Sequence, residues 1–599
     1  MCRSPVGLHQ RLLIIRFQFS NVCSRILRLV TLGGAKMLGC KCLSWTQVAC
    51  FSKQEQQTFS LPAPIPEWPQ GTGFGTGIIR LGEIEVCQII KFEFVWGSNF
   101  SSYSGGRQGV SFYKPTGLPQ GFFNLGYYAQ PNANPLQGFV LGARAVSKSN
   151  HGDYSPPLRD PEDYTLVWCS NDGTDDEFDG SGYFWLPQPP EGYKSLGFVV
   201  TNKPAKPELC EVKCVRDDLT DPCETHHVML KTYSKFSQTP ILVWNTRPCY
   251  RGKQGRGVSV GTFVCSEYLS LREELGVVCL KNFDDALHAM PNLDQIHALI
   301  RHYGPTVFFH PDEVYLPSSV SWFFENGALL CKKGDGSETI DPEGSNLPAG
   351  GTNDGEYWID LPRDSRRGTL KQGNIRSAKL YVHVKPAMGG TFTDIVMWIF
   401  CPFNGPATLK VGVLNFVLGK VGRHVGDWEH FTLRLSNFTG ELQSIYFSQH
   451  SGGEWVNIYN LEFIEGNKAV IYSSKHGHAS YPHPGVYIQG SSALGVGIRN
   501  DASRSNYYVD SSVCYEIVSA EYLGNGVVIE PCWLQYMREW GPRIVYDSMG
   551  EVDRISNVLP MSLGVSVQSI FNKLPGELCG EAGPSGPKEK NNWMGDERW

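Results

Sequence analysis

The sequence predicts a mainly β protein, on three observations from its composition and pattern. Its 599 residues include 65 Gly and 38 Pro, aromatic residues make up 12%, and charged residues make up 19%. Gly and Pro set tight turns, and aromatic residues favour strands. Short runs of alternating apolar and polar residues recur along the second half. We therefore expect an N-terminal prism-like repeat domain followed by a C-terminal β-sandwich with a few short helices.

Composition also excludes several classes of protein. A hydrophobic content of 41% is too high for a disordered chain. The net charge of −6 gives no general attraction to nucleic acid, so we expect no nucleic-acid partner. No run of about 18 uncharged apolar residues appears, so we predict no membrane-spanning helix. The 18 Cys are too sparse for a disulfide scaffold. These features favour a cytoplasmic or peripheral membrane location.

The first part of the chain differs from the rest. Residues 1–54 carry eight basic residues and no acid, a bias typical of organelle transit peptides. The alternative is an upstream extension with Met37 as the working start. We assign 1–56 as an N-terminal extension that is either disordered or a targeting segment.

An internal repeat marks residues 57–288. Pro119-Gln120-Gly121-Phe122 leads to Leu125-Gly126-Tyr127, and Pro190-Glu191-Gly192-Tyr193 leads to Leu196-Gly197-Phe198. Pro and Gly indicate a turn, and the aromatic residues that follow indicate a strand with a glycine bend. The repeated residues are structural types, so this unit fits a repeat domain better than an enzyme cleft.

These units, and the order of segments after them, resemble the plant vacuolar protein sorting-associated protein 62 family from about residue 57 to about residue 575. The segments that carry the resemblance are 210–223 (CEVKCVRDDLTDPC), 302–316 (HYGPTVFFHPDEVYL), 424–430 (HVGDWEH) and 476–485 (HGHASYPHPG). The resemblance implies a non-enzymatic role in membrane traffic or vacuolar sorting. It is compatible with recognition of membrane lipid head groups or glycans.

Residues 289–575 are predicted to form the β-sandwich, and residues 576–599 a disordered tail. Asn292 fits the N-cap of a helix that ends at Tyr303 before Gly304-Pro305. Alternating runs from Ala378 to Val384 and from Phe431 to Leu435 predict strands. Residues 530–542 are predicted to form a short packed helix.

The densest polar cluster lies at residues 423–430. On a strand, Asp427 and Glu429 point to one face and Trp428 to the other. Two carboxylates at a sheet rim are costly to hold together unless a cation or hydrogen-bond donors neutralise them. The alternatives are therefore a metal site and a purely structural, hydrogen-bonded rim.

This cluster resembles the heptapeptide signature of the necrosis- and ethylene-inducing-like proteins. The resemblance implies a divalent cation, with Mg²⁺ or Ca²⁺ favoured, held by His424, Asp427 and Glu429. Asn404 stands where that family has a further Asp. His476, His478 and His483 form a second cluster that either adds ligands or builds a turn.

Two other functions stay open at this point. One is a metal-dependent hydrolase that uses Asp427, Glu429 and His424, and the other is a membrane-perturbing defence protein. No nucleophile elbow, Walker loop or zinc-protease helix is present in the sequence. The sequence does not indicate an oligomeric state.

Overall fold

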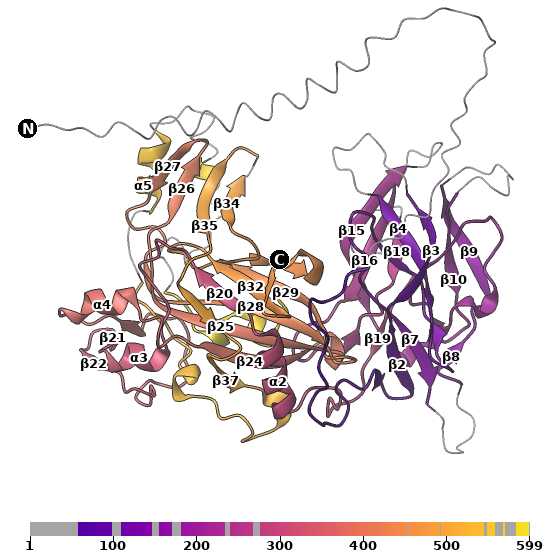
Figure 1. Cartoon of the computed structure of the whole chain (residues 1–599), viewed down its shortest axis with the longest axis horizontal. Coiled ribbons are helices and arrows are strands. Elements are labelled where there is room, and N and C mark those ends of the chain that lie inside the picture. The colour runs from indigo at the N-terminus through magenta and orange to yellow at the C-terminus, as the bar shows by residue number, and fades with distance from the viewer. Residues whose placement is uncertain are drawn as a thin grey trace, which may run out of the picture. The chain divides into compact units, whose positions relative to one another are not determined.

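The prediction of a mainly β fold is confirmed, since antiparallel sheets dominate and helices are few and short (Figure 1). The structure is a computed structural model, and it describes residues 58–98, 109–146, 155–170, 181–233, 240–266, 276–450, 452–491, 493–543, 548–557, 567–569 and 583–597. The predicted extension at 1–56 lies outside these residues. Within them, no helix has both the length and the apolar character needed to cross a membrane. Residues 56–599 form one compact unit, and the boundary at residue 288 stays a prediction.

Three antiparallel sheets of the first half surround one aromatic core. Phe112, Phe184 and Phe263 come from the three sheets, and the Phe112 ring centroid lies 4.9 Å from that of Phe184 and 5.1 Å from that of Phe263. The sheets are β3 (Lys91–Gly97), β4 (Val110–Thr116) and β6 (Tyr128–Pro131); β9 (Asp163–Cys169), β10 (Tyr183–Gln188) and β12 (Val199–Thr201); and β15 (Cys223–Tyr233), β16 (Pro240–Pro248) and β18 (Phe263–Ser266).

Three further sheets accompany them and enclose a second, mainly aliphatic core. Their strands are β1 (Ile78–Arg80), β2 (Ile84–Ile89), β7 (Val140–Ala145) and β5 (Phe123–Asn124); β11 (Tyr193–Lys194), β13 (Cys214–Arg216) and β8 (Leu158–Arg159); and β14 (Thr220–Asp221), β19 (Cys279–Lys281) and β17 (Gly257–Val258). Each sheet of the aromatic core thus has a companion sheet in the aliphatic core, and the pair occurs three times along the chain.

The repeat seen in the sequence sits at matching places in the first two pairs of sheets. Gly121 and Gly192 adopt φ of 82° and 77° in turns of the same kind, which only glycine adopts without strain. Gly126 and Gly197 approach so closely that a Cβ on Gly126 would lie 2.9 Å from the Gly197 Cα. The third pair has Gly261-Thr262-Phe263 at this place, without the Leu-Gly pair that we used to find the others.

A long six-stranded sheet forms the centre of the second half. Every residue of β25 is buried, and β28 is buried along most of its length. Register runs from Phe392 opposite Ser436 to Asn404 opposite His424. In order across the sheet, its strands are β30 (Gly452–Asn457), β29 (Leu442–Gln449), β28 (His424–Ser436), β25 (Phe392–Asn404), β24 (Leu380–Ala387) and β37 (Tyr515–Ser519).

Both faces of this sheet are covered, so it is the middle of a layered structure. One face packs on α2 (Leu293–Tyr303) and on a second sheet. As predicted, Asn292 caps α2, and its side chain accepts from the Gln295 backbone N–H at 2.9 Å. The second sheet contains β31 (Phe463–Ile464), β32 (Lys468–Ser473), β33 (Ser480–Tyr481), β20 (Thr306–Phe309) and β36 (Tyr508–Asp510).

The other face packs on α3 (Val320–Glu325), α4 (Arg366–Gln372) and aromatic residues that include Trp533 and Trp540. The helix predicted over 530–542 is only a 3₁₀ turn, η6 (Cys532–Gln535). A small sheet lies on this side of the central sheet, and its strands are β22 (Ser337–Thr339), β21 (Leu329–Lys332) and β23 (Tyr357–Asp360). Elsewhere in the chain, further 3₁₀ turns are η1 (Leu209–Glu211), η2 (Asp217–Leu219), η3 (Met388–Gly390), η4 (Ile458–Asn460) and η5 (Glu521–Leu523).

A further four-stranded sheet stands apart from the layers at one end of the second half, next to α5 (Ser548–Ser556) (Figure 1). Its outer strands leave part of their residues exposed. In order, the strands are β27 (Leu414–Val417), β26 (Thr408–Val411), β35 (Val496–Ala502) and β34 (Gly485–Ser491).

Residues 583–597 differ from the prediction of a disordered tail at 576–599. They form η7 (Pro587–Glu589) and α8 (Asn591–Met594) and pack on the central sheet. The Trp593 side chain is 2% exposed and stacks on His383 with ring centroids 3.9 Å apart. Burial of this large ring, together with ion pairs of Asp596 and Glu597, explains the order that composition alone did not indicate.

Candidate functional site

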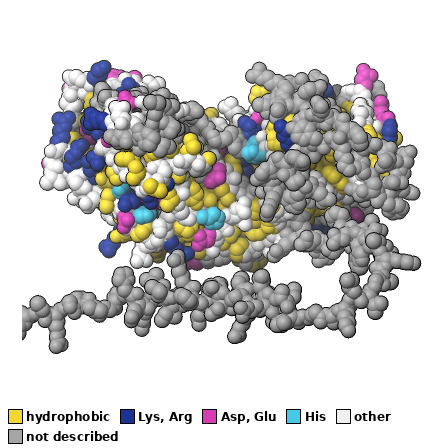
Figure 2. All heavy atoms as spheres, turned by 90° about the horizontal axis from the view of Figure 1, so that it is seen from above, with side chains coloured by type: hydrophobic (Ala, Val, Ile, Leu, Met, Phe, Trp, Pro, Cys, Tyr) yellow, Lys and Arg dark blue, Asp and Glu magenta, His cyan; other side chains and the backbone are white. Residues whose placement is uncertain are grey.

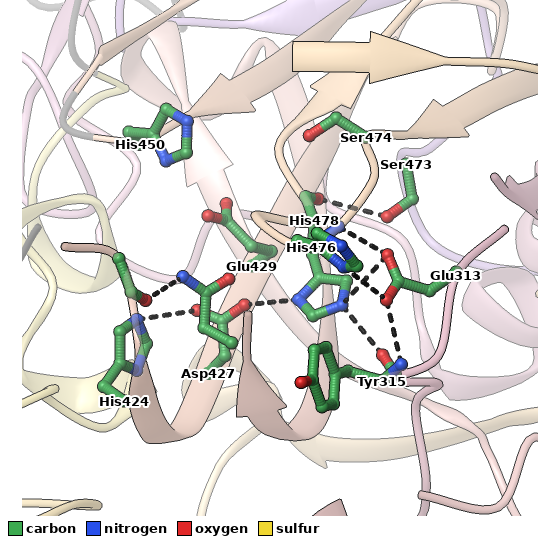
Figure 3. A network of polar contacts seen from close by, with 12 residues as sticks. Glu313, Tyr315, His424, Asp427, Glu429, His450, Ser473, Ser474, His476 and His478 are labelled. Carbon is green, nitrogen blue, oxygen red and sulfur yellow. Dashed lines mark hydrogen bonds and ion pairs between the residues drawn. The ribbon is translucent and has the colours of Figure 1, made fainter. Parts of the chain in front are cut away.

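Polar residues from four separate segments meet at one end of the inner strands of the central sheet (Figure 3). They come from the loop after β20, the end of β25, the start of β28 and the loop between β32 and β33. On β28 the predicted alternation holds: Trp428 packs in the core of one face, while Phe431 and Leu433 pack in the core of the other. Asp427 and Glu429 share the second face, where the four segments converge.

His478 lies at the centre of this group. Its Nδ1 is 2.7 Å from Asp427 Oδ2, and its Nε2 is 2.9 Å from the Tyr315 carbonyl oxygen. An ionised carboxylate and a carbonyl only accept hydrogen bonds, so both ring nitrogens donate and the ring is an imidazolium. Burial alone would lower the pKa of His478, but Cys401, Asp427 and Glu313 together raise it well above its ordinary value.

Glu313 provides the second negative charge beside His478. One of its oxygens accepts from the backbone N–H groups of Val314 and Tyr315 at 2.9 and 2.8 Å, and the other accepts from the backbone N–H of His476. Burial raises the pKa of Glu313, but hydrogen bonds from His476 and the charge of His478 outweigh it and lower this pKa to about 2. Glu313 is therefore a buried, ionised carboxylate.

Asp427 and Glu429 carry different charges although they are neighbours on one strand. Burial opposes ionisation of Asp427, but the bond from His478 and the nearby His424 leave its pKa below the ordinary value. Burial and the charge of Asp427 raise the pKa of Glu429 well above its ordinary value. Ser448 Oγ lies 2.9 Å from Glu429 Oε2. The surroundings thus push the two pKa values apart, favouring the ionised form of Asp427 and the neutral form of Glu429.

The predicted metal ligands are near one another but have other partners. His424 Nε2 lies 3.8 Å from Asp427 Oδ1, and the Asn404 amide nitrogen donates to the Gly422 carbonyl oxygen. Across the ranges that the structure describes, no three His, Cys, Asp or Glu side chains are arranged to hold a metal ion. The residues as placed therefore do not form a cation site, and the divalent cation stays a prediction.

The histidines of the second predicted cluster separate into two kinds. His476 and His478 join the group, with His476 Nδ1 3.3 Å from Glu313 Oε1. His483 lies at an exposed position outside the group, and its backbone oxygen accepts from the Tyr487 hydroxyl at 2.8 Å.

Three residues of this site have a strained backbone conformation. His450, His476 and His478 adopt positive φ of 58°, 69° and 52°, a region that non-glycine residues seldom occupy. The surrounding hydrogen bonds hold these residues in that conformation, and such strain is typical of functional sites.

A pocket of about 130 Å³ opens beside the group, between the central sheet and the β26–β35 sheet. Two of its wall residues, Asn404 and Asn500, are 3% and 2% exposed. The pocket is lined by Asn404, Gly405, Pro406, Ala407, Thr408, Val417, Gly422, His450, Lys475, His476, Gly477, Ile498, Arg499, Asn500 and Asp501.

Two polar atoms in this wall have no hydrogen-bond partner among the described residues. They are the Asn404 Oδ1 acceptor and the Asn500 Nδ2 donor, and both are covered. Asn500 Oδ1, by contrast, is 3.1 Å from His450 Nε2. Buried amide atoms without a partner are costly, so these two atoms indicate a ligand or water that the wall is built to bind.

Glu313, His450 and Asn500 are the residues of this site that sequence reasoning missed. Glu313 lies in the segment His310-Pro311-Asp312-Glu313, directly after the apolar strand β20. Acidic residues at the end of a buried strand were a usable signal, because such residues have to find donors. No local signal singles out Asn500, since its role depends on the pairing of β35 with β26.

Comparisons with known proteins agree on a family. A model of the vacuolar protein sorting-associated protein 62 family matches residues 55–597. Vacuolar protein sorting-associated protein 62 of Saccharomyces cerevisiae is 26% identical over 216 residues, which are 32% of this chain and 42% of that protein. The putative vacuolar protein sorting-associated protein TDA6 of the same yeast is 21% identical over 306 residues, which are 41% of this chain and 60% of that protein. The chain thus spans about half the length of these relatives.

Similarity to solved structures is looser. GNIP1Aa from Chromobacterium piscinae is 15% identical with a TM-score of 0.26, over 36% of this chain and 40% of that one. NLPPya in complex with mannosamine is 13% identical with a TM-score of 0.19, over 40% of this chain and 77% of that one.

The family match is the stronger result, because it extends over almost all the residues that the structure describes. The expectation of a plant member stays a prediction, since both relatives come from yeast. The chain belongs to the vacuolar protein sorting-associated protein 62 family.

Proposed function

We propose that the chain acts in vacuolar sorting as a non-enzymatic binding protein, and that its pocket recognises the hydroxyl-rich head group of a lipid or a glycan. Membership of the family supports the sorting role. The pair of unpartnered amide atoms in the pocket wall carries the choice of ligand.

A hydroxyl group suits this wall because it donates and accepts at the same time. One hydroxyl can donate to Asn404 Oδ1 and another can accept from Asn500 Nδ2. Since both atoms are covered, the amide groups have to turn toward the ligand, a rotation about a single side-chain bond. A sugar or inositol ring offers several hydroxyls and fits a cavity of this polarity better than an apolar molecule.

The charges of the site support binding rather than catalysis. The two basic residues of the wall already face acids, since Arg499 Nε is 2.7 Å from Asp501 and Lys475 Nζ is 3.6 Å from Asp312. Asp427 and Glu429 do not line the pocket. The polar group behind the pocket therefore holds the shape of the wall, and the proposal assigns it no proton-transfer step.

Ligand-observed NMR on the full chain tests this proposal. Mannose, galactose, N-acetylglucosamine and myo-inositol serve as probes, and we expect saturation transfer from the protein to at least one of them. Asn500→Ala should weaken that signal, while Asn525→Ala at an exposed position should not. The sugar should be recovered unchanged.

Two results would contradict the proposal. One is a blank result for all probes with protein whose thermal unfolding is cooperative. The other is chemical conversion of a probe, which would favour the hydrolase alternative instead.

A further inference from the structure

The end of the β26–β35 sheet carries an unusual set of exposed aliphatic side chains. Val413, between β26 and β27, is 90% exposed, and Leu414 and Val417 on β27 are 51% and 70% exposed. Leu494, between β34 and β35, is 55% exposed. Large aliphatic residues at such exposure are costly in water, and a group of them indicates a surface that binds something.

These residues belong to two hairpins whose tips lie side by side. Val411 is opposite Val496 in the register of β26 and β35, and the backbone N–H of Gly412 donates to the Gly495 oxygen at 2.9 Å. The tip of one hairpin, with Val413 and Leu414, therefore lies next to the tip of the other, with Leu494. We call the residues Val413, Leu414 and Leu494 the hairpin-tip patch, whereas Val417 lies opposite Thr408 at the pocket end of the hairpin.

The tips project away from the rest of the fold. The β26–β27 hairpin leaves the central sheet after Asn404 at the end of β25 and returns to it at His424 at the start of β28. In Figure 1 the four strands stand together at one end of the second half, beyond the central sheet. The tip lies about four residues along β26 from Thr408 in the pocket wall, which is a distance of roughly 13 Å along an extended strand.

The two hairpins carry basic residues and no acid within their own sequence, although Arg499, opposite Thr408 at the pocket end of the sheet, pairs with Asp501 just beyond it. Residues 405–426 and 484–500 contain no Asp or Glu, and they contain Lys410, Lys420, Arg423 and Arg499. The whole chain, by contrast, has a net charge of −6. Glu551 of α5 accepts from the backbone N–H of Gly419 at the base of the hairpin rather than at its tip.

Figure 2 looks onto this end of the molecule. On the second half of the chain, hydrophobic side chains gather there, with Lys, Arg, His and some Asp and Glu side chains between and beside them. Aliphatic residues at the tips, with Lys410 on the strand behind one tip and Lys420 and Arg423 at the base of that hairpin, match the two layers of an anionic membrane surface. The aliphatic side chains enter the acyl boundary, and the cations meet the lipid phosphates and carboxylates.

We propose that the two hairpin tips dock the protein on anionic lipid membranes by inserting the hairpin-tip patch into the bilayer surface. A second copy of the chain or a protein partner would not require basic residues behind the tips, whereas a bilayer with negative head groups gives them a role. The docked tips would place the pocket opening near the level of the head groups, although the docking itself does not depend on the ligand of the pocket.

Vesicle co-sedimentation with the full chain tests this proposal. The probes are vesicles of phosphatidylcholine alone and vesicles in which part of it is replaced by phosphatidylserine. We expect binding to the phosphatidylserine vesicles that weakens as salt is raised, because exposed charges are screened. The triple variant Val413→Ser, Leu414→Ser, Leu494→Ser should bind more than about tenfold more weakly, since it removes most of the inserted apolar surface.

Matched control variants distinguish binding through the patch from nonspecific adsorption to vesicles. The double variant Val513→Ser, Ile529→Ser removes two aliphatic residues that are 73% and 84% exposed elsewhere, and it should bind like the wild type. Lys410→Gln with Lys420→Gln should weaken binding about fivefold or more for each charge, and Lys194→Gln with Lys333→Gln should change little. All four variants lie at partly or fully exposed positions, so cooperative unfolding should be retained and is checked by thermal denaturation.

Three outcomes would overturn the proposal. They are failure of the folded wild type to bind either vesicle, equal binding by the triple variant and the wild type, and a triple variant whose only change is lost self-association in light scattering. A sugar screen that fails while vesicle binding succeeds would reject the proposed pocket ligand and leave the membrane surface supported.

Discussion

The central sheet carries two buried groups of charges, one on each face, and only one of them has open space beside it. The His478 group consists of Glu313, Asp427 and His478 and borders a pocket of about 130 Å³. The Arg434 group lies on the other face, where Arg434 pairs with Asp394 through two bonds of 2.8 Å and with Asp596 at 3.0 Å. The cavity there is only about 10 Å³.

The reason for the difference is the chain segment at 583–597. Lys385 donates to the Gly595 oxygen at 2.8 Å, and Glu597 pairs with His430 at 3.0 Å, so this segment covers most of the Arg434 group. Both groups neutralise their carboxylates with cations of the protein itself. Buried charge alone is therefore not the basis of the proposed ligand site, which rests on open space lined by amide atoms without a partner among the described residues.

The largest expected effect comes from removing the cation of the His478 group. His478→Ala leaves Asp427 and Glu313 buried without their shared partner, and it should lower the free energy of unfolding by roughly 3–5 kcal/mol. Urea denaturation measures this change. His483→Ala, at an exposed position in the same loop region, is the control and should change the free energy by less than about 0.5 kcal/mol. A small effect for His478→Ala would show that the imidazolium does not hold the group together.

The free energy of unfolding should depend on pH through Glu597, in the segment that covers the Arg434 group. Burial raises the pKa of Glu597, but His430 and Lys385 outweigh it and lower this pKa from 4.5 to about 2. Because the folded pKa is lowered, the stabilisation is present above pH 4.5 and is lost as pH falls toward 2. The full loss is about 3 kcal/mol.

Unfolding free energies of the wild type and Glu597→Gln, compared from about pH 6 down to about pH 3, test this sign. The difference between them should shrink as pH falls, because the unfolded wild type takes up a proton at Glu597 that the folded protein, with its lowered pKa, does not bind. Glu338→Gln on exposed β22 is the control. A difference that stays constant would mean that Glu597 stabilises the fold through hydrogen bonds alone. Glu313 titrates in the same window, so only the matched variant isolates Glu597.

Local pattern was enough to predict the repeat turns, the helix capped by Asn292 and the face that Asp427 shares with Glu429. In each case the decisive contacts lie within a few residues or on one strand. The rest depended on distant contacts. The cation next to Asp427 is His478, which reaches it only because the loop between β32 and β33 lies over β28. The sequence was compatible with a metal ion there because carboxylates need a positive charge, and composition does not say which atom supplies it.

The smallest effect concerns Glu429, and it sharpens the difference between two carboxyl groups on one strand. If Glu429 is neutral beside ionised Asp427, Glu429→Gln keeps the charge and nearly the shape of the side chain, and it should change the free energy of unfolding by less than about 1 kcal/mol. Asp427→Asn removes a charge that His478 needs and should cost about 3 kcal/mol. Denaturation of both variants at neutral pH gives the comparison. Equal costs would mean that Glu429 is ionised, and His478 would then be neutralising three carboxylates rather than two.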